Sequence, residues 1–151
     1  SERGIRVVHL RFGIVLSPQG GALKAMLGPF RLGLGGKAGS GEQFWSWITL
    51  RDVARAMSHA LRIEALSGPV NLVAPPPVTN AEFTKALGRA LRRPTILPLP
   101  AFVARALLGR EMADELLLAS ARVEPARLLE TRFAFRLATL EEGLRAALGS
   151  G

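Results

Sequence analysis

Short apolar runs rich in β-branched residues occur twice in the first half of the chain and predict two core strands. The first run covers residues 5–10, with residues 13–16 as a candidate extension, and the second covers residues 70–73. Glycine and proline clusters follow both runs and predict turns there. A third run, over residues 44–50, is aromatic and predicts another short strand.

Helical spacing of apolar residues begins at two polar residues in the middle of the chain. Asp52 precedes apolar residues three or four apart, and its carboxylate can cap the free amides of a first turn. Thr79 and Glu82 form the capping-box pattern, which predicts a second helix start. The predicted apolar faces are Val53, Met57, Ala60 and Leu61 in the first helix, and Phe83, Ala86, Leu87, Ala90 and Leu91 in the second.

Residues 22–31 predict an earlier helix, which Pro29 bends or ends. Residues 95–98 resemble an edge strand, since a proline without an amide donor closes them. From Pro100 onward the pattern is mostly helical, with predicted helices over residues 102–108, 112–120, 124–129 and 139–148. This order of elements predicts an α/β or α+β fold of few strands with a mostly helical tail.

Composition narrows the class of protein. The 151 residues are 48% hydrophobic and contain no cysteine, which suits one compact domain and excludes disulfides and thiolate metal sites. No apolar stretch approaches the ~20 residues of a membrane span and no signal peptide is visible, so a cytoplasmic setting is the default expectation. The net charge of +8 could serve nucleic acid, but the cations are scattered along the chain, so that function ranks last.

Two segments are candidates for ligand binding. Residues 33–41 are dense in glycine, and such loops can cradle phosphates, but the order is neither G-x-G-x-x-G nor a Walker loop. Trp45 and Trp47 alternate on one strand and would share a face, where they serve either as core or as a stacking wall. His9 and His59 have no partners at metal-ligand spacing, so we expect both to be structural.

The absence of tyrosine is more informative than these weak motifs. Without tyrosine the chain has no Tyr-x-x-x-Lys pair, so it cannot by itself fill the roles of proton donor and ribose-binding lysine in a Tyr/Lys reductase. No serine has the context of a nucleophile elbow either. The 151 residues alone therefore predict no catalytic residue.

Several motifs in order resemble the epimerase-like extended short-chain dehydrogenases/reductases. The motifs are LRFGIVL at residues 10–16, GGA at 20–22, PFRLGLGG at 29–36, GSG at 39–41, SWI at 46–48, NLVAP at 71–75, TNAEF at 79–83 and RP at 93–94. The resemblance implies an α/β fold, namely the C-terminal fragment of an extended NAD(P)-binding Rossmann-type protein. It further implies two parts, residues 1–92 from the Rossmann-like and substrate-binding region and residues 93–151 as a small helical domain.

The resemblance also assigns residue roles. Phe12, Gly13, Ile14 and Val15 would pass the nicotinamide end of the cofactor, at the carboxyl edge of the sheet. Gln43, Trp45 and Trp47 would contact the substrate. Asp52 matches the family's aspartate at a helix start, where we expect a structural cap. The cofactor, NADP or NAD, would bind the full-length protein and not this fragment alone.

Three positions depart from the family pattern. Thr49 stands where relatives often have histidine, Trp45 where sugar-nucleotide epimerases carry an arginine for the diphosphate, and Ile14 where they have an asparagine. These departures predict a more apolar pocket than the family name suggests and weaken the case for a nucleoside-diphosphate sugar. A nucleotide sugar stays one candidate for the small-molecule substrate. The leading hypothesis is the substrate-binding portion of an NAD(P)-dependent epimerase or reductase whose Rossmann half lies outside these residues. The alternatives are a non-catalytic binding or homo-oligomerisation module and, last, a nucleic-acid-binding domain.

Overall fold

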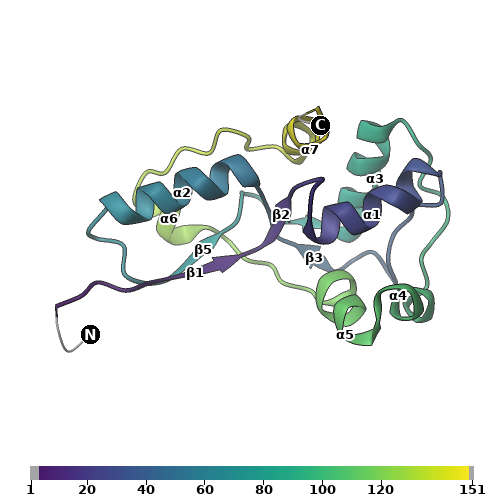
Figure 1. Cartoon of the computed structure of the whole chain (residues 1–151), viewed down its shortest axis with the longest axis horizontal. Coiled ribbons are helices and arrows are strands. Elements are labelled where there is room, and N and C mark those ends of the chain that lie inside the picture. The colour runs from purple at the N-terminus through teal and green to yellow at the C-terminus, as the bar shows by residue number, and fades with distance from the viewer. Residues whose placement is uncertain (1–3, 150–151) are drawn as a thin grey trace.

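The computed structural model describes residues 4–149 and shows an elongated molecule (Figure 1). Its strands form three two-stranded sheets. These are β1 (Val8–Phe12) with β5 (Gly68–Leu72), parallel; β2 (Ile14–Leu16) with β4 (Trp47–Thr49), parallel; and β3 (Phe44–Trp45) with β6 (Val78–Thr79), antiparallel. Helices join the parallel strands, as in α/β proteins.

Eight helical segments surround these strands in the described part of the chain. They are α1 (Gly21–Arg31), α2 (Leu50–Arg62), α3 (Asn80–Leu91), α4 (Ala101–Leu108), α5 (Arg110–Met112), the π-helix η1 (Ala113–Leu118), α6 (Ala126–Glu130) and α7 (Leu140–Gly149). Helix α2 runs along the β1–β5 pair, whereas α1, α3, α4 and α5 lie toward the opposite end of the molecule (Figure 1). None of the helices within residues 4–149 is long and apolar enough to cross a membrane.

The buried side chains form two clusters, one for each end of the molecule. Around β1–β5 and α2, the first cluster centres on Ile48, Val70 and Leu72, each with no exposed area. The second cluster joins α1, α3 and α7 around Trp47 and Phe83, also fully buried. Because β4 contributes Trp47 to one cluster and Ile48 to the other, this short strand connects the two.

Gly13 is the point at which the chain changes its strand partner. Its amide donates to Leu72 O at 3.3 Å, beside β5, while the next amide, Ile14 N, donates to Ser46 O at 2.7 Å, beside β4. A Cβ atom on Gly13 would lie 2.4 Å from Ser46 O and 2.9 Å from Val73 Cγ1, too close for any side chain. The sequence predicted one run with an extension, and the close approach at Gly13 divides it into β1 and β2.

The capping box predicted at Thr79 is confirmed. Thr79 Oγ1 accepts from Glu82 N at 3.2 Å, and Glu82 Oε2 accepts from Thr79 N at 2.7 Å, so both free amides are satisfied as α3 begins. Helix α1 covers the predicted residues and runs to Arg31, so Pro29 lies inside the helix and does not end it. Local side-chain chemistry was therefore enough to place the start of α3, although Ala90, predicted for the apolar face of this helix, is exposed.

Helix α2 corrects two predictions. Its N-cap is Thr49, whose hydroxyl accepts from Asp52 N at 3.2 Å, so the Asp52 carboxylate is left for other donors. Its buried face carries Val53, Ala56 and Ala60, because that side packs on the sheet. The other two residues predicted for this face, Met57 and Leu61, are 44% and 78% exposed.

The strands predicted over residues 95–98 and 44–50 are also corrected. The first forms no strand in the described chain, because Pro94, Pro98 and Pro100 lack the amides a ladder needs; only an isolated bridge, Ala38 to Leu99, forms nearby. The second divides at Ser46 into β3 and β4, which pair with different strands, and Leu50 already belongs to α2.

Candidate functional site

A cavity of about 510 Å³ opens where β1 ends and β2 begins. Four segments line it, namely residues 12–15 with 17, residues 20–22, residues 44–46, and residues 115, 119 and 121. Ligands of open parallel α/β sheets bind outside the carboxyl ends of the strands, and Phe12 is the carboxyl end of β1. The cavity is therefore the candidate functional site.

The cavity brings together five of the seven residues predicted for cofactor and substrate. Phe12, Gly13, Ile14 and Val15, predicted beside the cofactor, all line it, and so does Trp45, predicted beside substrate. The side chain of Phe12 is 52% exposed, which is unusual for a phenylalanine and leaves its ring accessible at the wall.

Trp45 is a fixed part of this wall. The residue is only 3% exposed, and its ring meets that of Phe83 edge-to-face, with 5.1 Å between the centroids. Its Nε1 donor is buried and has no acceptor among the described residues. A buried donor without an acceptor costs about 1–3 kcal/mol, so the Phe83 contact and the surrounding burial must outweigh that cost.

Gln43 and Trp47 do not line the cavity. Gln43 Nε2 donates to Ala38 O at 2.9 Å, and the backbone oxygen of Gln43 accepts from Asn80 N at 2.9 Å. These two bonds hold the glycine-rich loop against the start of α3. Trp47 is fully buried and borders a separate hollow of about 330 Å³ between α3 and the start of α7. The two tryptophans share one apolar cluster yet reach different hollows.

Sequence reasoning missed the contribution of the segment that follows η1. Ser46 Oγ donates to Ala121 O at 2.7 Å and accepts from Val123 N at 3.0 Å, and Ser120 Oγ accepts from Phe44 N at 3.0 Å. These bonds hold the segment along β3 and thereby place Ala121 at the cavity. No local signal could have predicted pairings between residues about 75 positions apart.

Glu115 of η1 is the one ionisable residue among those that line the cavity. Its neighbour Asp114 pairs instead with Arg105, Oδ1 to Nε 2.7 Å, outside the cavity wall. The nearby Arg122 also stays outside the wall, with its guanidinium carbon 5.3 Å from the centre of the Phe44 ring. The cavity surface is thus apolar with a single carboxylate.

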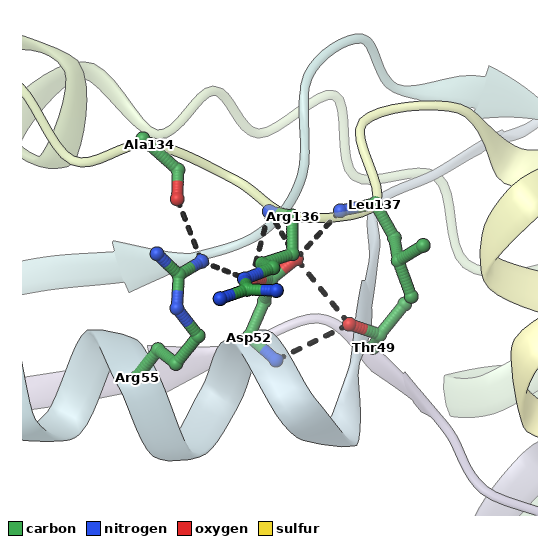
Figure 2. A network of polar contacts seen from close by, with 6 residues as sticks. All are labelled: Thr49, Asp52, Arg55, Ala134, Arg136 and Leu137. Atoms are coloured by element: carbon green, nitrogen blue, oxygen red, sulfur yellow. Dashed lines mark hydrogen bonds and ion pairs between the residues drawn. The ribbon is translucent and has the colours of Figure 1, made fainter.

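Asp52 forms a second polar site, and its role is structural. Its carboxylate is fully buried and accepts from Arg136 N at 3.1 Å and Leu137 N at 3.2 Å, and from Arg55 Nη1 at 2.8 Å (Figure 2). Figure 2 shows these donors converging on one side chain at the start of α2, beside the Thr49 cap. The expected structural role of Asp52 is thus realised as an anchor for the segment that leads into α7.

Neither His9 nor His59 lines the cavity. His59 Nε2 contacts Thr131 Oγ1 at 2.9 Å, and burial, together with the charge of Arg62, lowers the pKa of His59 below its ordinary value. His9 is exposed on β1. Among residues 4–149, no three His, Cys, Asp or Glu side chains gather as a metal site would require.

The cavity lining suits the flat-ring end of a dinucleotide. Phe12, Ile14 and Val15 offer apolar wall to a flat ring such as nicotinamide, but no cation lines the cavity to receive a pyrophosphate. The sequence likewise has no G-x-G-x-x-G turn for that group. The residues present therefore fit the flat ring of the cofactor.

The fold and the cavity are those of part of a Rossmann-like α/β protein. Comparisons with known proteins show which proteins of this class the chain resembles. The epimerase family protein Mb2239 of Mycobacterium bovis is 51% identical over 143 residues, which cover 95% of this chain and 47% of that protein. The human epimerase family protein SDR39U1 (isoform 2), solved with NADPH, superposes with a TM-score of 0.89 at 42% identity, over 97% of this chain and 49% of that one.

Two further matches agree. A nucleoside-diphosphate sugar epimerase from Corynebacterium glutamicum superposes with a TM-score of 0.68 at 32% identity, over 96% of this chain and 27% of that one. A family model described as a domain of unknown function (DUF1731) matches residues 99–147. These similarities confirm the resemblance to the epimerase-like extended short-chain dehydrogenases/reductases and the α/β fold class. It spans about half the length of the curated relatives it matches.

Proposed function

We propose that these residues form the substrate side of an NAD(P)-dependent epimerase-like oxidoreductase or isomerase in the cytoplasm. In this proposal the nicotinamide end of NADP or NAD meets Phe12, Gly13, Ile14 and Val15, and substrate lies against Trp45. One observation carries it: all five residues line a single cavity at the carboxyl end of a parallel strand. The NADPH of the human relative supports the choice of cofactor class.

In this function the chain contacts the cofactor and the substrate and forms a wall of their cavity. We assign no proton-transfer group to it. The cofactor, when bound, provides the hydride chemistry. The apolar wall around Ile14 and Val15 excludes water from the reacting carbon, and Ser46 holds the strand and the segment after η1 in place. The catalytic tyrosine and lysine and the dinucleotide glycine motif would come from residues beyond these 151. Gln43 and Trp47 stay predictions as substrate contacts.

Filling the cavity tests this function. In the full-length protein, Ala119→Phe puts a ring at the cavity wall, whereas Ala90→Phe adds the same bulk on an exposed part of α3 that lines no described cavity. We expect the unaltered protein to bind NADPH or NADH in a fluorescence titration, Ala119→Phe to weaken binding at least about tenfold, and Ala90→Phe to leave it unchanged. An intact protein that binds neither nucleotide, or an Ala119→Phe protein that binds normally, contradicts the proposal.

An exposed apolar stripe on α2 favours a second role, association with another chain as a homo-oligomer. Leu50, Met57 and Leu61 are 53%, 44% and 78% exposed on this helix. Such a stripe is typical of interaction surfaces. Light scattering of the protein and of a Met57→Lys/Leu61→Lys variant tests this role, which requires a dimer or larger species that the variant breaks.

A further inference from the structure

We infer that one end of the molecule docks on an anionic lipid surface. The docking surface consists of two neighbouring segments, residues 31–37 at the end of α1 and residues 92–102 from the end of α3 into α4, which we call the distal tip. The distal tip lies at the end of the molecule opposite β1 and α2 (Figure 1). The inference goes beyond the proposed function and uses no residue that lines its cavity.

Backbone contacts hold the two segments of the distal tip together. Leu99 N donates to Lys37 O at 2.9 Å, and Gly39 N donates to Leu99 O at 3.1 Å. Gly33 also approaches Pro94, since a Cβ atom added to Gly33 would lie 3.8 Å from Pro94 Cγ. The exposed side chains of both segments therefore belong to one region of the surface.

The distal tip exposes large apolar side chains on both of its segments. Single exposed apolar residues are common on proteins, but several on neighbouring segments mark an interaction surface. Five of them are between 52% and 82% exposed, namely Leu32, Leu34, Ile96, Leu97 and Phe102.

The charge of the distal tip has one sign. Its four ionisable residues are all exposed cations, and the adjoining residues 24–30 and 83–91 add three exposed cations and no carboxylate. The seven cations are Lys24, Arg31, Lys37, Lys85, Arg89, Arg92 and Arg93. Within residues 4–149 none of the seven forms an ion pair. Their positive charge is therefore left to attract an anionic partner.

An anionic bilayer surface matches both the apolar side chains and the cations. Aliphatic and aromatic side chains enter the boundary between lipid headgroups and acyl chains, while arginine and lysine reach the anionic headgroups. Each cation near an anionic leaflet strengthens binding roughly fivefold. The distal tip carries both groups on the same two segments, as an interfacial surface requires.

Three other partners fit the distal tip less well. A symmetric dimer would place the cations of one copy against the same cations of the other. The Rossmann half of the proposed function would continue the parallel sheet from β1, at the opposite end of the molecule (Figure 1). A nucleic acid would engage the cations through its phosphates but would leave the aliphatic side chains of Leu32, Leu34 and Ile96 without a partner.

Vesicle binding of the full-length protein tests the inference. Co-sedimentation measures its partition onto vesicles of phosphatidylcholine alone and onto vesicles with about 30% phosphatidylserine, at about 0.1 M salt. We expect the partition onto the anionic vesicles to be at least about tenfold stronger. A protein that binds neither kind of vesicle, or both alike, contradicts the inference.

An apolar substitution and its control test for insertion into the lipid. Ile96→Ser should weaken binding to the anionic vesicles about threefold or more, because the isoleucine side chain no longer enters the boundary. Leu129→Ser is the matched control, since Leu129 is also exposed, at 50%, but lies on α6 away from the distal tip. Equal binding of the two variants contradicts insertion at the distal tip.

Charge substitutions test the electrostatic part. Arg31→Gln/Arg93→Gln should weaken binding to the anionic vesicles about tenfold, and Arg31→Lys/Arg93→Lys should retain it, because lysine keeps the charge. Arg51→Gln/Arg62→Gln removes the same charge from α2 and should change binding by less than about twofold. If both glutamine variants lose binding equally, the general charge of the protein and not the distal tip is responsible, and the inference is wrong.

Two further measurements separate the rival partners. If the distal-tip variants weaken binding to a short DNA duplex but not to vesicles, the surface serves nucleic acid and the inference is wrong. If Ile96→Ser splits a dimer in light scattering without weakening vesicle binding, the surface joins two copies and the inference is equally wrong. The nucleotide titration with Ala119→Phe is independent of these results, so a failure of the inference and a failure of the proposed function are distinguishable.

Discussion

The carboxylate of Asp52 accepts hydrogen bonds from Arg136 N at 3.1 and 3.2 Å, although the two residues stand 84 positions apart. The bond ties the start of α2 to the segment before α7, and Leu137 N adds a further donor. Because Thr49 caps the helix, the Asp52 carboxylate is free to serve this distant backbone. The segment leading into α7 is thus held by one buried side chain.

The anchor predicts that Asp52→Asn destabilises the protein by about 2–3 kcal/mol, because the amide accepts fewer and weaker hydrogen bonds than a buried carboxylate. Urea unfolding measures the loss. Asp114→Asn is the control, since its ion pair with Arg105 is well exposed and contributes at most about 1 kcal/mol. Equal losses in the two variants would contradict an anchoring role for Asp52.

The close approach of the backbone at Gly13 leads to a second prediction, a steric loss of stability when a Cβ atom is added there. Gly13→Ala places a Cβ 2.4 Å from Ser46 O, so β2 must shift away from β4, with an expected cost of about 2–3 kcal/mol. Gly28→Ala is the counterpart: its Cβ would meet no atom within 4 Å, and alanine should stabilise α1 by about 0.5–1 kcal/mol. Thermal unfolding of both variants checks the opposite signs.

The capping box of α3 predicts that Thr79→Ala costs about 1 kcal/mol, because the amide of Glu82 loses its acceptor. Thr79→Ser should recover most of the loss, since serine presents the same hydroxyl. Chemical unfolding of the three proteins measures it. A serine variant as unstable as the alanine variant would place the effect in the lost methyl group and not in the cap.

His59 predicts a pH dependence of stability. Burial and Arg62 lower its pKa in the folded state, so the unfolded state binds the proton more readily, and this contribution to stability is lost as the pH falls below the unfolded value of 6.5. The free energy of unfolding between pH 7.5 and 5.5 should therefore fall less steeply in His59→Gln. Identical slopes in His59→Gln and in the unaltered protein would contradict His59 as the cause.

Local chemistry made much of the chain predictable. The helix at Thr79 was placed correctly because threonine and glutamate three apart satisfy each other's amides, whatever the rest of the chain does. The exposure of Met57 and Leu61 was not predictable in the same way. Spacing shows that a helix has an apolar side, but α2 has more apolar positions than the sheet covers, and packing decides which of them are buried.

The candidate site also contains residues that were expected from the sequence and residues that only the structure revealed. The residues at Phe12 to Val15 were expected beside a ligand because they resemble a family motif, and they do line the cavity. Glu115 was not expected there, since η1 reaches the cavity only through bonds such as Ser46 Oγ to Ala121 O, across 75 positions. Only folding brings that wall to the motif.

By itself, the residue pattern predicted helix starts such as the one at Thr79, because these depend on interactions within a few residues. The α/β class and the expectation that residues 12–15 lie beside a ligand came from the resemblance of the motifs to a family. The tertiary structure decided the partner change at Gly13, the use of Asp52 as an anchor and the single carboxylate of the cavity. These depend on close approach between segments distant along the chain, where the atoms that meet are set by three-dimensional packing and not by residue spacing.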